Sequence, residues 1–85
     1  MTTKRTSSAV EYADLIRRLP APSERRAIRE AARLSQAFIA RDLDVSPALV
    51  SKWERGDAVP SRRLLRSYFD LLTALRGETV EGAQA

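Results

Sequence analysis

The 85-residue sequence contains no cysteine and no histidine. It therefore has no disulfide, no thiolate or imidazole ligand for zinc, no cysteine nucleophile and no imidazole acid or base. Most enzyme mechanisms need one of these groups, and no pair of Asp or Glu residues falls in a recognisable catalytic arrangement. We expect a binding protein, not an enzyme, with no metal, no cofactor and no small-molecule substrate.

Long apolar runs are also missing. No stretch approaches the roughly 18 residues that a membrane span needs, and the N-terminal residues lack the apolar core of a signal peptide. No segment alternates with the period of two that is typical of strands. The sequence thus predicts an all-α protein without a membrane-spanning segment, and the cytoplasm is its expected location.

Positive charge is what the sequence has in excess. Fifteen Lys and Arg residues stand against eleven Asp and Glu residues, for a formal net charge of +4. Two of the acids lie in residues 78–85, which contain no base, so residues 1–77 carry a net charge of +6. Such a balance suits a polyanionic partner, and DNA, RNA and an acidic membrane surface are the candidates.

The length allows one small domain. Hydrophobic residues make up 44% and charged residues 31% of the sequence, which is typical of a soluble globular domain. We expect a flexible basic arm over residues 1–7, a folded domain over residues 8–77 and a disordered acidic tail over residues 78–85.

Capping residues and apolar spacing predict the first two helices. Ser8 and Glu11 stand in the Ser-x-x-Glu relation of a capping box, and apolar residues follow at helical spacing until Pro20. After this break Ser23 can cap a second helix that runs to about Arg33.

Three more helices follow. Ser35 can cap a short third helix. Ser46 can cap a fourth helix, which has Pro47 at its first position and stops at Gly56. Ser61 can cap a long last helix that is closed by Gly77. The third and fourth helices, over residues 35–55, form the pattern of a helix-turn-helix motif.

The stretch from Ile28 to Pro60 resembles the Xre/Cro family of phage-type, lambda-repressor-like transcriptional regulators. In that family Gln opens the first motif helix, a small residue lies where the two helices cross, and apolar residues fill the turn and the second helix. The corresponding residues here are Gln36, Ala40, Val45, Val50 and Trp53. The resemblance implies a five-helix lambda-repressor-like DNA-binding domain with an additional N-terminal helix.

The same resemblance implies one ion pair and shows two departures. The family pairs an Arg of the preceding helix with a Glu near the end of the recognition helix, and the matching residues are Arg29 and Glu54; the alternative for Arg29 is a solvated helix face. Asp44 stands in the turn where the family most often has Gly, and Asp tolerates the left-handed backbone needed there. Phe38 stands where the family usually has an exposed polar residue.

The resemblance also implies which side chains face DNA. Base contacts are expected from Ser46, Pro47, Ala48, Ser51 and Lys52. Phosphate contacts are expected from Gln36, Arg55, Arg62 and Arg63. Lys52 is the main specificity candidate because it can donate to guanine O6 and N7; the alternative is an ordinary solvated lysine.

Other basic residues lie outside this set. Lys4 and Arg5 in the arm can enter a minor groove, or simply serve solubility. Four arginines of the first two helices are interpreted as solvated faces that strengthen nonspecific attraction to DNA. These are Arg17, Arg18, Arg25 and Arg26.

Together these features predict a sequence-specific regulator of transcription, a repressor that binds double-stranded DNA as a homodimer on a palindromic operator. The last helix has two apolar rows, of which one can pack on the core and the other on the first helix or a second subunit. The rows are Leu64, Tyr68, Leu71 and Leu75, and Leu65, Phe69 and Leu72. An antitoxin or a protein-bridging factor is the alternative function, which Phe38 and the short C-terminal tail leave open. The family resemblance also implies a bacterial or phage-infected host cell, where we expect the protein in the cytoplasm and associated with the nucleoid.

Overall fold

A computed structural model describes residues 8–77. Within this range the chain forms five α-helices and no strand, which confirms the all-helical prediction. The helices are α1 (Ser8–Arg18), α2 (Pro22–Ala31), α3 (Gln36–Leu43), α4 (Pro47–Arg55) and α5 (Arg62–Leu75). The arm and the tail expected at residues 1–7 and 78–85 lie outside the described residues.

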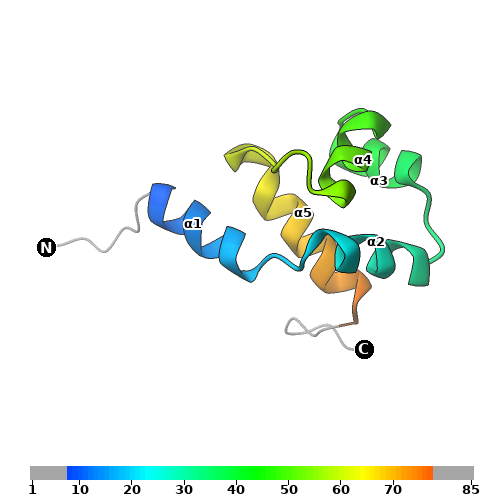
Figure 1. The fold of residues 1–85 in the computed structure, drawn as a ribbon, viewed down its shortest axis with the longest axis horizontal. Helices are drawn as coiled ribbons and strands as arrows, with labels where there is room; N and C mark the ends of the chain where they lie inside the picture. Colours follow the sequence, from blue (N-terminus) through cyan, green and yellow to red (C-terminus); the bar gives the residue numbers. More distant parts are fainter. Residues whose placement is uncertain (1–7, 78–85) are drawn as a thin grey trace, which may run out of the picture.

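The helices are arranged around α5 (Figure 1). Helices α1, α2 and α3 all contact α5, while α4 packs on α2 and α3. The α3–α4 pair lies on one side of α2, and α1 lies apart from this pair, against the first half of α5 (Figure 1). The helix-turn-helix pair is therefore supported by α2 and α5, and α1 is an additional element on the far side of α5.

Trp53 and Tyr68 form the centre of the hydrophobic core. Both side chains are almost fully buried, and their ring centroids lie 4.6 Å apart at an interplanar angle of 38°. Ala40 is only 1% exposed, and its small side chain lets α3 approach α4 closely at the predicted crossing point. The remaining buried hydrophobic residues are Leu15, Leu19, Ile39, Val50, Leu65 and Leu72.

The prediction that one of the two apolar rows of α5 packs on the core is wrong. The buried residues of this helix are Leu65, Tyr68 and Leu72, which combine members of both predicted rows. Because α1, α2 and α3 approach α5 from different directions, one central stripe is covered from several sides. The other apolar residues of α5 are partly buried beside it.

Some helix ends differ from the predicted ones. Helix α2 begins at Pro22, one residue before the predicted cap Ser23, because extended Ala21 occupies the N-cap position and its N–H donates to the Glu24 carboxylate at 3.2 Å. It ends at Ala31, two residues early, since Arg33 adopts a left-handed φ of 63°.

The serine caps expected for α3 and α5 behave differently. Ser35 Oγ accepts the Phe38 N–H at 3.0 Å, as predicted for the start of α3. Ser61 takes the N-cap position of α5, but its side chain makes no capping hydrogen bond.

The turn between α3 and α4 has the conformation expected for its sequence. Asp44 is left-handed, with φ 60° and ψ 48°, and ends α3 as its C-cap. The Val45 N–H then donates to the Ala40 carbonyl at 2.9 Å. Asp44 thus replaces the glycine that such a turn favours, at a modest conformational cost.

Two buried polar atoms, Trp53 Nε1 and the Tyr68 hydroxyl, have no hydrogen-bond partner among the residues that the structure describes. A buried hydroxyl without a partner costs about 1–3 kcal/mol. Burial also raises the pKa of Tyr68 to about 12. The hydroxyl therefore weakens the fold, and it is protonated in the folded protein well above the pH at which it ionises in the unfolded chain.

We expect Tyr68→Phe to raise the free energy of unfolding at pH 7 by about 1 kcal/mol, because it removes this unpaired hydroxyl. The wild-type protein should also lose stability as the pH rises from 10 to 12, since the unfolded tyrosine releases its proton first. Tyr68→Phe should lack this loss. Urea unfolding at pH 7 and pH 11 measures both effects, and a variant less stable than wild type at pH 7 contradicts the prediction.

Candidate nucleic-acid interface

One face of α4 is open to solvent. Pro47, Ala48, Lys52 and Arg55 are exposed and Ser51 is half-buried, and these positions share one side of the helix. The opposite side is buried and contains Val50, Trp53 and Glu54. The structure thus brings together on one exposed face all the residues predicted on α4 for base contacts, with Arg55 at its C-terminal end.

Ser46 lies just before α4 and acts as its N-cap. Its Oγ accepts the Leu49 N–H at 3.1 Å. The serine hydroxyl can still donate its hydrogen, because a hydroxyl oxygen that accepts one bond keeps its O–H donor. Its predicted place at the start of the exposed face therefore comes with a structural role in starting α4.

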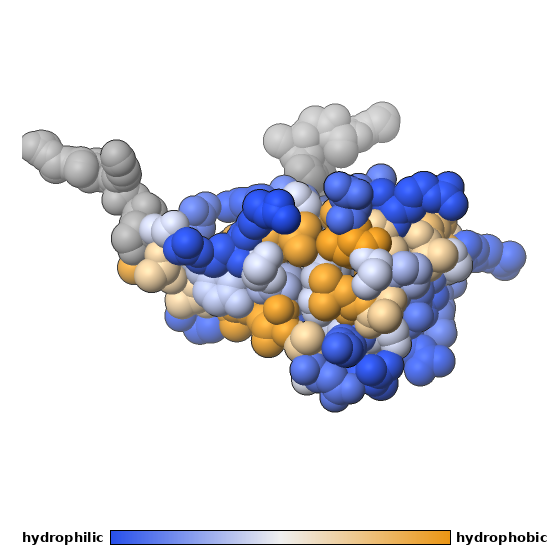
Figure 2. All heavy atoms as spheres, turned by 90° about the horizontal axis from the view of Figure 1, so that it is seen from above, coloured by the Kyte–Doolittle hydropathy of each residue, from blue (hydrophilic) through white to orange (hydrophobic). Residues whose placement is uncertain are grey.

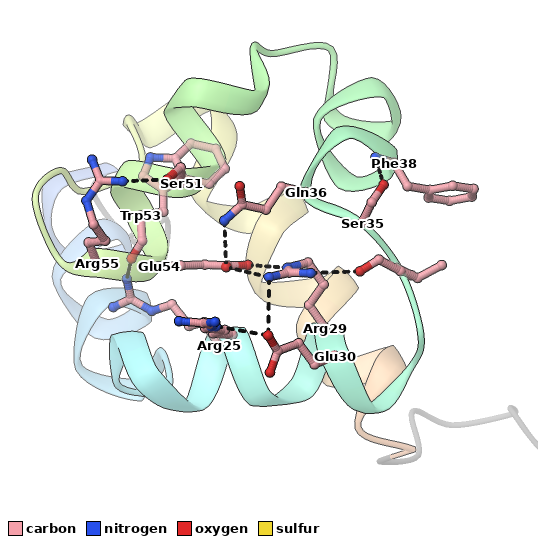
Figure 3. A network of polar contacts seen from close by, with 12 residues as sticks. Arg25, Arg29, Glu30, Ser35, Gln36, Phe38, Ser51, Trp53, Glu54 and Arg55 are labelled. Carbon is pink, nitrogen blue, oxygen red and sulfur yellow. Dashed lines mark hydrogen bonds and ion pairs between the residues drawn. The ribbon is translucent and has the colours of Figure 1, made fainter.

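Arg55 is held by local partners at the end of α4. Its Nε donates to Asp57 Oδ2 at 2.9 Å. Its Nη1 donates to Ser51 Oγ (Figure 3). Both acceptors lie at the protein surface, so these bonds can be exchanged for bonds to an anion at small cost. The guanidinium thus stands beside the middle of the exposed face of α4.

Glu54 is the centre of a polar network that joins three helices (Figure 3). Arg29 of α2 donates to it twice, from Nε to Oε2 at 2.6 Å and from Nη2 to Oε1 at 2.9 Å. Gln36 of α3 donates from Nε2 to Oε1 at 3.0 Å. The side chains of Glu54 and Arg29 are only 4% and 12% exposed. The pair that the resemblance implied lies in direct contact, and it fixes α4 relative to α2 and α3.

The charge of Glu54 is stabilised in this buried position. Burial alone disfavours the ionised carboxylate, but the hydrogen bonds from Arg29 and Gln36 and the positive charge of Arg29 outweigh it, so the pKa of Glu54 lies below its usual value. The hydrogen bond to Glu54 likewise raises the pKa of Arg29. Both groups are therefore charged at neutral pH.

Gln36 is a member of this network through its hydrogen bond to Glu54. One hydrogen of its amide is used by Glu54, which leaves the second hydrogen and the carbonyl oxygen for another partner. The geometry leaves room for the predicted phosphate contact, which stays a prediction, and adds a structural role in the network.

Arg25 was predicted to be solvated, and this prediction is wrong. Its Nε donates to the Pro20 carbonyl at 2.7 Å, and its Nη1 donates to the Trp53 carbonyl at 2.8 Å. The side chain thus ties the connection before α2 to the last turn of α4. The four-residue spacing of Arg25 and Arg29 places them on one face of α2 and was the available signal. The other three arginines, Arg17, Arg18 and Arg26, are exposed.

An open hollow lies between α2, α3 and α4, next to the exposed face of α4. The exposed guanidinium groups of Arg26 and Arg55 contribute to it together with the buried network. Its lining residues are Arg26, Arg29, Ser35, Gln36, Ser51, Glu54 and Arg55. The hollow is therefore polar and predominantly cationic.

The remaining predicted residues lie in three different places. Arg62 and Arg63 are exposed in the first turn of α5. Lys4 and Arg5 lie outside the described residues. Phe38 is 51% exposed, and its ring points away from the polar network (Figure 3).

Figure 2 shows the molecule from the side on which α3 and α4 lie in Figure 1. Apolar groups appear there as several small patches, separated by hydrophilic residues. Broad apolar surfaces are typical of permanent protein interfaces, whereas this face is mixed and charged at its edges. Within residues 8–77 no group of three metal-binding side chains occurs, and no helix there is long and apolar enough to cross a membrane.

The family model of the helix-turn-helix domain matches residues 26–81, about two thirds of the chain. The match contains α3, α4 and α5 completely and most of α2, whereas α1 lies outside it. No curated protein and no solved structure matches the chain.

Proposed function

Since this chain belongs to the helix-turn-helix domain family, we propose that it is a sequence-specific regulator of transcription that binds double-stranded DNA through α4. The observation that carries this proposal is the exposed face of α4, whose opposite side is locked by Glu54. A helix held rigidly with short and cationic side chains outward suits the major groove.

The base contacts are assigned to Pro47, Ala48, Ser51 and Lys52, with Ser46 at the edge. Lys52 donates to guanine O6 or N7, Ser51 bonds to a base or a phosphate, and the two apolar side chains contact a thymine methyl. The exposed side of the first turn of α4 carries only Pro47 and Ala48, which lets the backbone approach the bases closely.

Phosphates of the DNA backbone bind on both sides of α4. On one side the cationic hollow offers Arg26, Arg55 and the second amide hydrogen of Gln36. On the other side Arg62 and Arg63 lie at the N-terminus of α5, where the helix dipole also favours an anion. Such contacts position the protein without specifying sequence.

We expect Lys52→Ala to lower the affinity for the preferred duplex about tenfold to hundredfold and to relax the preference at one or two base pairs. Binding to random duplex should fall less than about threefold, because one phosphate contact at most is lost. Selection from a random duplex library with wild type and variant measures both. Arg17→Ala, which removes an exposed cation of α1, is the matched control and should keep the wild-type preference.

The proposal fails if the wild-type protein selects no sequence from the library. It is also contradicted if Lys52→Ala and Arg17→Ala weaken all duplexes equally, since Lys52 then acts only through its charge.

We further propose a lambda-repressor-like protein of the Xre/Cro type, which acts as a repressor by occluding a promoter. One small domain reads few base pairs, so a homodimer on a palindromic operator would supply the specificity. It acts without catalysis or a cofactor, in the cytoplasm and at the nucleoid.

The surface assigned to this homodimer is an apolar hollow between α2 and the end of α5. It lies on a different face of α2 from Arg25 and Arg29, so it leaves the α4 face free. Its lining residues are Glu24, Ala27, Ile28, Ala31, Leu75 and Arg76. Four of them are apolar, and identical surfaces of two chains can pack together there about a two-fold axis.

The second candidate function is an antitoxin or protein-bridging factor that uses the same domain. The exposed ring of Phe38 favours it, because a large apolar side chain at the surface suits a protein contact. Co-purification of a defined toxin through Phe38, together with no duplex selected from the library, would favour this function over the first.

A further inference from the structure

We infer that α1 is a clamp that positions the start of α5 for phosphate binding, with Tyr12 as the positioning residue. This inference rests on the proposed DNA-binding function and deepens it, because it assigns a role to the helix that lies outside the family match. The contacts that carry it come from a single turn of α1.

Two neighbouring residues of α1 hold the region where α5 begins. The Tyr12 hydroxyl donates to the Pro60 carbonyl at 3.1 Å, across 48 positions of sequence. Glu11 Oε2 accepts from Arg66 Nη2 at 3.0 Å, one turn into α5. One contact therefore fixes the connection before α5, and the other fixes the helix itself.

The connection from α4 to α5 has backbone hydrogen bonds at its start, while Ala58 packs against the core and Pro60 is buried. Gly56 ends α4 with a φ of 79°, and the Asp57 N–H donates to the Lys52 carbonyl at 2.9 Å. The Pro60 side chain is fully buried, but proline has no N–H, and its carbonyl is bound by Tyr12. The placement of Arg62 and Arg63, which follow after Ser61, thus rests on the burial of Pro60 and on the Tyr12 hydrogen bond to its carbonyl.

Different residues of this region pack on the core and hold the start of α5. Leu15 of α1 and Leu19 just after it are buried in the core and anchor the helix, whereas Tyr12 is half-buried. Arg62 shares with Tyr12 and Glu11 a hollow between α1 and α5. Removal of the hydroxyl alone therefore changes how α5 is held but not how α1 packs.

The test compares Tyr12→Phe with Tyr68→Phe, the same chemical change at the second tyrosine of the chain, in the core. Affinity for a random 20-base-pair duplex is measured as a function of NaCl concentration. We expect Tyr12→Phe to weaken binding about threefold to tenfold and to make the slope of log K against log salt shallower by about one. Tyr68→Phe should keep the wild-type slope.

A double-mutant cycle separates positioning from general destabilisation. In a background with Arg62→Ala and Arg63→Ala, Tyr12→Phe should have less than about a twofold effect on binding, since the groups that it positions are gone. An unchanged slope, or the same fold-loss in both backgrounds, overturns the inference. Amide NMR shifts at residues 61–63 of Tyr12→Phe check the local change. The Tm of this variant should differ from that of wild type by no more than about 8 °C.

The two proposals fail in different ways. Wild-type protein without salt-dependent binding to duplex DNA overturns the proposed function and the clamp together. Wild-type binding with an unchanged Tyr12→Phe variant overturns the clamp alone.

Discussion

Arg29→Met is expected to lower the free energy of unfolding by about 3–5 kcal/mol, the cost of leaving one partner of a buried ion pair without its counterion. The variant keeps most of the side-chain volume but removes both hydrogen bonds to Glu54, which is 4% exposed. It also removes the bond from Arg29 Nη1 to the Leu34 carbonyl at 2.8 Å. Urea unfolding at pH 7 measures the loss.

The matched control is Arg26→Met, three residues earlier on the same helix. Arg26 pairs with Glu30 at 2.9 Å, but these side chains are 63% and 53% exposed. An exposed pair contributes about 0–1 kcal/mol, so this variant should unfold almost like wild type. Equal losses in the two variants would contradict the buried role of Arg29.

The double variant Arg29→Met with Glu54→Met should regain much of the lost stability. A buried ion pair can often be replaced by apolar residues of similar volume at little cost, whereas one charge alone cannot stay buried without cost. The cycle of single and double variants should give a coupling energy above about 1.5 kcal/mol. DNA selectivity should remain impaired, since the network that orients α4 is gone.

Acid provides an independent check of the same network. Because the folded pKa of Glu54 lies below the unfolded value, its contribution to stability is present above the unfolded pKa and is lost as the pH falls through the folded pKa. The unfolded value is about 4.3, so the loss begins below that pH. Glu54→Gln should show a shallower loss of stability than wild type between pH 5 and pH 3.

Leu72→Glu is expected to unfold the domain, with a loss of about 4 kcal/mol or more. Leu72 is 2% exposed and lies in the central stripe of α5, so the variant buries a carboxylate without a partner. A single core in a domain of about 70 residues supplies only about 3–5 kcal/mol of stability, so this loss is enough to unfold it. Circular dichroism at 25 °C should show lost helix, and a folded Leu72→Glu variant would contradict the described core.

Self-association must therefore be tested on a surface residue. Ala31→Arg places a large cation in the apolar hollow of α2 and α5, at a C-terminal helix turn that accepts positive charge. If wild type has the mass of two chains by light scattering, this variant should have the mass of one. Ala13→Arg, at an exposed position of α1, is the control. A variant that stays dimeric assigns the interface elsewhere.

The local features of the motif could be predicted from the sequence because they depend on neighbours in the chain. Ser35 and Ser46 cap helices whose first turns follow them directly, and Asp44 tolerates the left-handed turn by its own side-chain properties. The exposed face of α4 follows from helical spacing once the apolar side is known.

Other features depend on contacts between distant segments. The partners of Arg25 are the backbone carbonyls of Pro20 and Trp53. Every residue has such a carbonyl, so the sequence does not show which ones Arg25 binds. The Tyr12 contact with Pro60 is hidden for the same reason. The buried stripe of α5 could not be assigned either, because apolar residues on two sides of a helix do not say which side faces the core.

Arg25 has a consequence for communication through the fold. It binds one carbonyl beside α1 and another in α4, so a displacement of α1 that moves Pro20 changes the support of α4, the helix proposed to face DNA. Binding free energies at two such linked sites are reciprocal. A molecule that binds α1 and alters DNA affinity by some factor must itself be bound more or less tightly, by the same factor, when DNA is present.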